Sequence, residues 1–239
     1  MPRQFLTDFA ERCKEVEEYL CLIRFYDDIA TNKKTKLKAI DHYGNEIDYT
    51  PSNQTQQILR SSFYVIVYNL IEATANSIIT SVLDQINDEK VPLVELKDRI
   101  VILYVRNKLL NKNDKNRINY ITEVMKDVKK KRHVKIDGFR LNISGNVDYD
   151  FITEILKNIG CVGRIPIDSN STLKDIFLKI KTNRNELAHG NKLFSTNGSV
   201  LILKNLECEY WEVKAFFKQV LENLESFLDT RRYIDKPKT

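Results

Sequence analysis

The sequence is poor in the residues that build metal centres and disulfide frameworks. Its four cysteines, Cys13, Cys21, Cys161 and Cys208, are scattered, with no CxxC pair and no histidine at metal-ligand spacing. A zinc site and a disulfide framework are therefore not expected, and we interpret the thiols as core residues. No Asp/Glu/His cluster resembles those that hold magnesium or zinc, so we predict no metal and no other cofactor.

Long apolar runs, a secretory leader and flexible linkers are also missing. No uninterrupted apolar run approaches the length of a membrane span, and the first twenty residues lack the basic, apolar and small-residue regions of a signal peptide. We therefore predict a cytoplasmic protein with no membrane partner. With seven glycines and five prolines, no Gly/Ser/Pro stretch is long enough to separate domains, so a single domain over residues 1–239 is expected.

Apolar residues do recur at helical spacing along most of the chain. They predict an N-terminal helix over residues 5–29 and a long, central and strongly apolar helix over residues 54–86, after a start signal at residues 51–53. Further helices are predicted at residues 94–110, 116–130, 149–159, 172–189 and 209–230. Asp148 and Gly160 are the expected caps of the helix at 149–159.

Two short segments alternate in hydrophobicity instead. KLKAIDHYGNEIDY, within residues 33–50, and VKIDGFRLNI, at residues 134–143, each surround a turn signal, and both predict a β-hairpin. The resulting fold class is all-α, a helical bundle with an N-terminal helix and two short β-hairpin insertions. Its expected parts are an extension at 1–52, a bundle core at 53–230 with the helix 172–189, and a charged tail at 231–239.

Among three histidines, His189 has the most informative context. It lies five residues after Arg184 in the segment RNELAHG, at the end of a predicted helix with cap signals at Ser171 and Gly190. Arg184 falls in the apolar stripe of this helix, so its guanidinium needs an acidic partner or an anionic ligand. A proton-carrying imidazole and a phosphate-binding arginine suit phosphodiester cleavage without a metal. The alternative is a structural salt bridge of Arg184 and a histidine that merely ends the helix.

Polar residues on the predicted central helix are the next candidates. Asn69, Glu72 and Asn76 are three and four residues apart, which places them in one stripe of an otherwise apolar helix. The stripe either faces solvent or supplies Glu72 as the acidic partner that a buried Arg184 requires.

A basic run supplies candidate RNA-binding residues, namely Lys129, Lys130, Lys131 and Arg132. These side chains could bind phosphates or simply form a solvated helix end. The net charge of +5 is compatible with a polyanionic partner, yet many proteins without one are equally basic.

The segment RNELAHG resembles the Arg-polar-x-x-x-His signature of the HEPN superfamily, whose members occur in toxin–antitoxin modules, anti-phage systems and RNA-guided RNases. ISGNVDYDFITEILKNIG, FSTNG and YNLIEATAN are similar to segments of one bacterial branch, so the resemblance covers roughly residues 54–228. It implies a bundle of four or five helices that pairs with itself and joins two Arg–His motifs in one cleft. It also implies metal-independent cleavage of RNA that leaves a cyclic phosphate.

The resemblance assigns a role to each matching residue. Arg184 would clamp the phosphate, His189 would act as acid and base, and Asn185 is the polar residue of the motif, while Glu72 and Asn69 would stand beside it. The implied partners are RNA, a second copy of the chain, and an antitoxin or restriction-type nuclease encoded nearby. The hypothesis is an endoribonuclease that acts as a toxin or anti-phage effector. The alternative is a HEPN-like module that dimerises, or binds RNA or a partner, without cutting.

Overall fold

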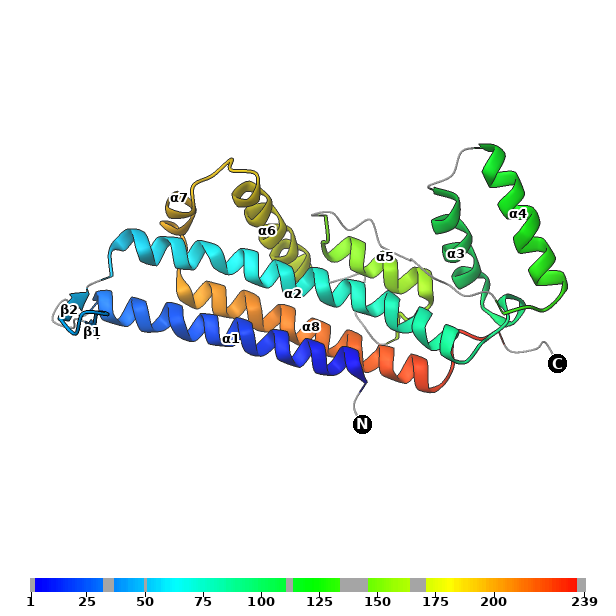
Figure 1. Cartoon of the computed structure of the whole chain (residues 1–239), viewed down its shortest axis with the longest axis horizontal. Coiled ribbons are helices and arrows are strands. Elements are labelled where there is room, and N and C mark those ends of the chain that lie inside the picture. Colours follow the sequence, from blue (N-terminus) through cyan, green and yellow to red (C-terminus); the bar gives the residue numbers. More distant parts are fainter. Residues whose placement is uncertain are drawn as a thin grey trace. The chain divides into compact units, whose positions relative to one another are not determined.

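The computed structural model describes residues 3–31, 37–49, 51–110, 114–133, 146–163 and 171–235. Its elements in chain order are α1 (Gln4–Thr31), β1 (Leu37–Ile40), β2 (Glu46–Tyr49), α2 (Asn53–Asp88), η1 (Leu93–Glu95), α3 (Asp98–Leu110), α4 (Asp114–Lys129), α5 (Tyr149–Ile159), α6 (Ser171–Ala188), α7 (Phe194–Gly198) and α8 (Leu203–Asp229), as drawn in Figure 1. The fold is therefore all-α, as predicted. The second predicted hairpin, at residues 134–143, lies outside the described residues.

The chain divides into two compact units. Unit 1 comprises Met1–Leu6, Glu72–Asn170 and Phe217–Thr239, and unit 2 comprises Thr7–Ile71 and Ser171–Phe216. Helices α1, α2 and α8 each contribute residues to both units. The expectation of a single domain over the whole chain stays a prediction.

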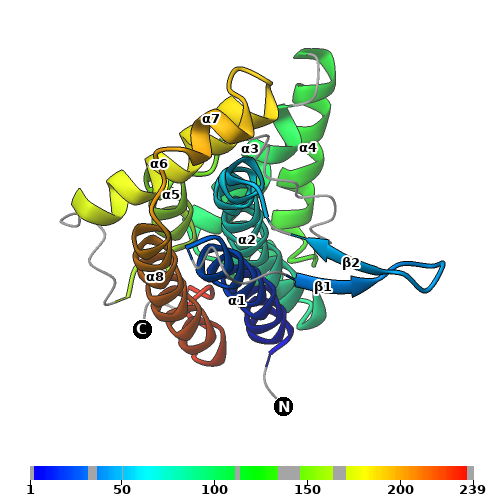
Figure 2. The same cartoon turned by 90° about the vertical axis from the view of Figure 1, so that its left-hand side faces the viewer.

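Unit 2 is built on the first part of α2, with α6 and α7 along one side of it (Figures 1 and 2). The predicted stripe of α1 is confirmed, because Val16, Leu20 and Ile23 are buried. On α6, the predicted apolar face is buried as well, and the ring of Phe177 meets that of Phe216 on α8 at 5.4 Å between centroids. This packing holds α6 by its apolar face while its C-terminal end reaches the surface.

The predicted first hairpin is present in unit 2. Strands β1 and β2 pair antiparallel, with Leu37 opposite Tyr49, and the hairpin projects from the helices in Figure 2. The carboxylate of Asp41 closes the turn by accepting hydrogen bonds from the backbone N–H groups of Tyr43 and Asn45. All strand residues except Leu37 are exposed, so the hairpin adds little to the core.

The caps predicted for α5 in unit 1 are both confirmed. The Asp148 carboxylate accepts a hydrogen bond from the backbone N–H of Phe151, and Gly160 ends the helix with φ +77°. Helix α3, in contrast, begins at Asp98 rather than near residue 94. The backbone of Leu96 is extended and bridges to Ile234, so the chain cannot be helical there.

The C-terminal segment differs from the predicted charged tail. Tyr233 is buried, its carbonyl accepts a hydrogen bond from the N–H of Lys97, and Arg231 pairs with Glu89 at 2.7 Å. The residues from 231 to 235 therefore pack into unit 1, although four of the nine positions 231–239 lie outside the described residues.

Two expectations drawn from composition also need correction. Cys13 and Cys161 are buried as expected, but Cys21 and Cys208 are exposed. Helix α2 is long and apolar enough to cross a membrane by length and composition, with a mean hydropathy of 1.3 over its most apolar window, although no uninterrupted run suggested it. Half of that window, 50%, is buried inside the protein, as in the central helix of a bundle.

Candidate active site

The Arg–His segment ends α6 in unit 2. After His189, Gly190 takes a φ of +71°, which L side chains rarely adopt. The N–H of Gly190 donates to the carbonyl of Leu187, and that of Asn191 donates to the carbonyl of Glu186 at 2.9 Å. This is a Schellman cap, and it confirms Gly190 as the predicted helix end. The cap fixes the backbone at His189 while the imidazole itself is exposed.

Arg184 is half-buried and stacks on an aromatic ring of α2. Its Cζ atom lies 4.6 Å from the ring centroid of Tyr68, which is buried, and its Nη1 donates to Oδ1 of Asn185 at 3.0 Å. A cation over an aromatic face is stabilised by roughly 0.5 to 2 kcal/mol. The ring and the Asn185 amide together restrict the orientation of the guanidinium plane, which an anion-binding arginine requires.

Lys179, five residues before Arg184 on α6, is a second cation that faces an aromatic ring of α2, and its role is structural. Nζ of Lys179 lies 5.9 Å from the ring centroid of Tyr64 and 2.5 Å from a carboxylate oxygen of Glu209. The hydroxyl of Tyr64 donates a hydrogen bond to the same carboxylate at 3.2 Å. Burial, and to a smaller extent the charge of Glu209, raises the pKa of Tyr64, so the phenol stays protonated. Lys179 therefore belongs to a charge-compensated structural cluster.

The predicted supporting residues Asn69 and Glu72 follow Tyr68 along α2. Asn69 is exposed and lines a groove of about 300 Å³ between α1 and α2, together with Tyr19. Glu72 is half-buried and belongs to unit 1. The support of Arg184 by Asn69 and its pairing with Glu72 both stay predictions.

Sequence reasoning passed over Tyr68, although it is the first residue of the quoted segment YNLIEATAN. An aromatic residue on an apolar helix is more often a core residue than part of a site. The available signal was its position one turn after Tyr64 on the same helix face. Only the structure shows which of the two rings carries Arg184.

The FSTNG segment forms α7, whose role is to hold the chain that follows the motif. The Asn197 amide donates to the Ser61 hydroxyl at 3.0 Å, and both residues are buried. A Cβ atom at Gly198 would lie 1.8 Å from the backbone oxygen of Gln57, so only glycine fits between α7 and α2. Both ends of the stretch from His189 to Gly198 are therefore anchored, one by the helix cap and one by α7.

Gly198→Ala is expected to destabilise the protein by about 3 kcal/mol or more, because the new methyl group meets rigid backbone. Gly160→Ala is the matched control. Its φ is also positive, but a Cβ there meets nothing within 4 Å, so the cost should be about 1 to 2 kcal/mol from backbone conformation alone. Urea unfolding measures both, and equal losses would contradict the close approach of α7 to α2.

The basic run lies in unit 1. Lys129 is the last residue of α4, the next three residues follow it in a turn, and all four side chains are exposed. Arg132 lies 3.8 Å from the carboxylate of Asp127. Within the described ranges, no group of three or more His, Cys, Asp or Glu side chains is placed to hold a metal ion.

An all-α chain with an Arg–His pair at a capped helix end has the features of a HEPN protein. A family model described as HEPN_MAE_28990-like HEPN matches residues 1–233. The chain therefore belongs to this HEPN family. The match also includes α1 and the first hairpin, which lie outside the residues 54–228 that carried the sequence resemblance. Comparisons with curated proteins and with solved structures found no match.

Proposed function

We propose that this HEPN protein is a metal-independent endoribonuclease that acts as a toxin or anti-phage effector. HEPN membership supports the coarser class, an RNA-related nuclease or effector function. The observation that carries the proposal is that one helix end presents both residues of the motif: Arg184 is oriented on the buried Tyr68 ring, and His189 is exposed where the helix cap fixes the backbone. One side chain can hold phosphate charge and the other can move protons.

In the proposed reaction, His189 removes the proton of a ribose 2′-hydroxyl, whose oxygen then attacks the adjacent phosphorus. The P–O5′ bond breaks, and the leaving oxygen takes its proton from an imidazolium, which in a composite site is the His189 of a second copy. The Arg184 fork stabilises the negative charge that builds up on the phosphorane oxygens. The products are a 2′,3′-cyclic phosphate and a 5′-hydroxyl.

Cleavage should persist in excess EDTA, since neither proton transfer nor charge stabilisation in this scheme uses a metal. The measurement is cleavage of a labelled RNA by purified protein with and without chelator. Activity that vanishes with EDTA and returns with magnesium would contradict the proposal. RNA binding without cleavage under both conditions would favour the alternative, a non-catalytic HEPN module.

We also propose that the active form is a two-fold dimer. Three large apolar side chains, Leu193, Val200 and Ile202, are exposed shortly after the motif, where burial by a second copy would be favourable. Analytical ultracentrifugation should show a dimer at about ten micromolar, a typical assay concentration. Ile202→Glu should weaken it, whereas Ile40→Glu in the hairpin should not. A strict monomer that still cleaves RNA would rule out the composite site.

Further parts of the proposal concern RNA contacts, partners and location. The side chains from Lys129 to Arg132 would bind phosphates and make RNA affinity fall with salt. An antitoxin or a restriction-type nuclease encoded nearby would be the protein partner, and the site of action would be the cytoplasm. Asn185, Asn69 and Glu72 would support the Arg184 clamp.

A further inference from the structure

Helix α4 presents large apolar side chains to solvent on a face that does not pack into unit 1. Its packed face includes Tyr120, which is buried with its ring centroid 6.5 Å from that of Tyr104 on α3. Ile118, Ile121 and Met125 lie on another face and are 68%, 46% and 51% exposed. A helix that packs against one partner normally has polar side chains on the face that it turns to solvent.

The spacing of the exposed side chains is that of a helix–helix seam. Ile118, Ile121 and Met125 stand at positions i, i+3 and i+7, and the half-buried Val128 follows at i+10. These are the alternating a and d positions of a heptad, which form a narrow stripe that packs against another helix. We call these four residues the α4 seam.

Positive charge surrounds one end of the α4 seam. Lys126 and the four residues from Lys129 to Arg132 are exposed there, whereas the nearby Asp127 already lies 3.8 Å from Arg132. A helix that covers the seam would meet this excess of cations, so acidic residues beside its apolar stripe are favourable. A second α4 packed in parallel is disfavoured, because it would place the two basic ends together.

We propose that the α4 seam docks an amphipathic helix of a different protein, whose apolar stripe is flanked by Asp or Glu residues. Single-stranded RNA would contact the basic run and leave the apolar stripe uncovered, so it does not explain the seam. The proposal concerns unit 1 alone and does not depend on the nuclease reaction.

The test uses a labelled helical peptide of about three heptads, with leucine at a and d and glutamate at e and g, and a scrambled peptide of the same composition. Fluorescence anisotropy with the full-length protein should show that the heptad peptide binds at least about tenfold more tightly than the scrambled one. The double variant Ile121→Ser/Met125→Ser should lose this difference. Lys129→Glu should weaken the heptad peptide by several-fold.

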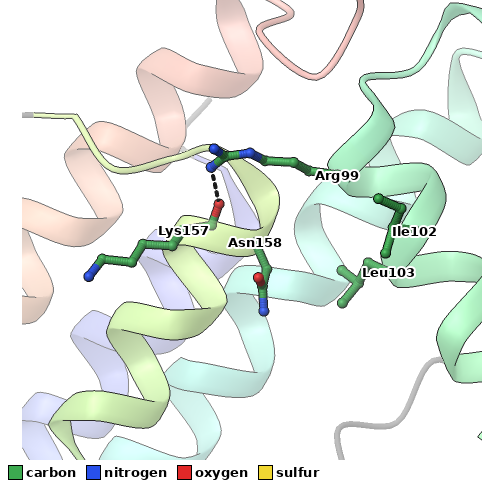
Figure 3. Close-up of a pocket in the computed structure, with 5 residues that line it drawn as sticks. All are labelled: Arg99, Ile102, Leu103, Lys157 and Asn158. Atoms are coloured by element: carbon green, nitrogen blue, oxygen red, sulfur yellow. Dashed lines mark hydrogen bonds between the residues drawn. The ribbon is translucent and has the colours of Figure 1, made fainter.

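The matched control is Ile102→Ser on α3, in the same unit. Ile102 is 63% exposed and borders a pocket of about 320 Å³ between α3 and α5, where Arg99 donates to the carbonyl oxygen of Lys157 at 2.8 Å (Figure 3). This variant removes an equally exposed apolar side chain away from the α4 seam, so it should bind the peptide like the wild type.

Several outcomes would overturn the proposal. They are equal binding of the heptad and scrambled peptides, unchanged binding by the seam variant, and equal weakening by Ile102→Ser. A second series measures binding of a single-stranded RNA and of phosphatidylserine vesicles, and self-association of the chain. If the heptad peptide does not bind and the seam variant loses RNA binding, vesicle binding or self-association, then RNA, a membrane or a second copy covers the α4 seam instead. RNA cleavage is assayed separately, so its absence would leave the α4 seam result unaffected.

Discussion

Replacing His189 with alanine is expected to lower the rate of RNA cleavage by on the order of a hundredfold or more while leaving RNA affinity nearly unchanged. The imidazole is exposed at the end of α6, so its removal should not disturb packing. It would instead remove the group that moves protons to and from the ribose and leaving oxygens. Single-turnover cleavage and RNA-binding titrations on the same samples separate the two effects.

The control for this experiment is His42→Ala, in the turn of the first hairpin, where the residue is exposed as well. This variant should cleave like the wild type. A deoxy version of the RNA substrate should resist cleavage, because it lacks the 2′-hydroxyl nucleophile. Equal RNA cleavage by wild type and His189→Ala would remove His189 from the mechanism, and efficient DNA cleavage would exclude 2′-hydroxyl attack.

Replacing Arg184 is expected to cause the second large loss of RNA cleavage. Arg184→Ala should lower cleavage by about a hundredfold or more, as expected when charge stabilisation of a transition state is removed. Arg184→Lys should recover little, because an ammonium group cannot reproduce the planar, bidentate fork. The measurement compares kcat and KM of the two variants. A lysine variant with near wild-type activity would show that charge alone suffices.

The Tyr68 ring gives this prediction a matched pair of variants. Tyr68→Leu removes the surface under Arg184 and should lower kcat by roughly tenfold, in line with the size of a partly buried cation–π contact. Tyr64→Leu removes an equally buried ring one turn earlier, under Lys179, and should cost similar stability with less loss of activity. If both variants lose activity in proportion to their stability, Tyr68 only packs the core.

Local signals predicted most helices, and tertiary contacts explain the exceptions. The caps at Asp148 and Gly160 are sequence-local devices, so the limits of α5 follow from the sequence itself. Helix α7 has no such signal: its five residues are held by contacts with α2 that lie far away in the sequence. Helix α8 begins at Leu203, six residues before its predicted start.

The candidate site also has a part that the sequence predicts and a part that depends on tertiary contacts. Arg184, His189 and the Gly190 cap could be predicted, because a motif and a helix end are properties of one contiguous segment. The contact with Tyr68 could not, since Tyr64 and Tyr68 are equivalent in pattern and differ only in which cation of α6 lies over each ring.

The face of α2 that meets α6 and α7 also restricts how this gene can change in length. Gln57, Ser61 and Tyr68 fall in one helical phase, with the first two in contact with α7 and the third under Arg184. One inserted residue between Ser61 and Tyr68 would rotate the ring by about 100° relative to the α7 contacts. Relatives that keep both contacts should therefore vary here by substitution, whereas insertions and deletions should collect in the loops.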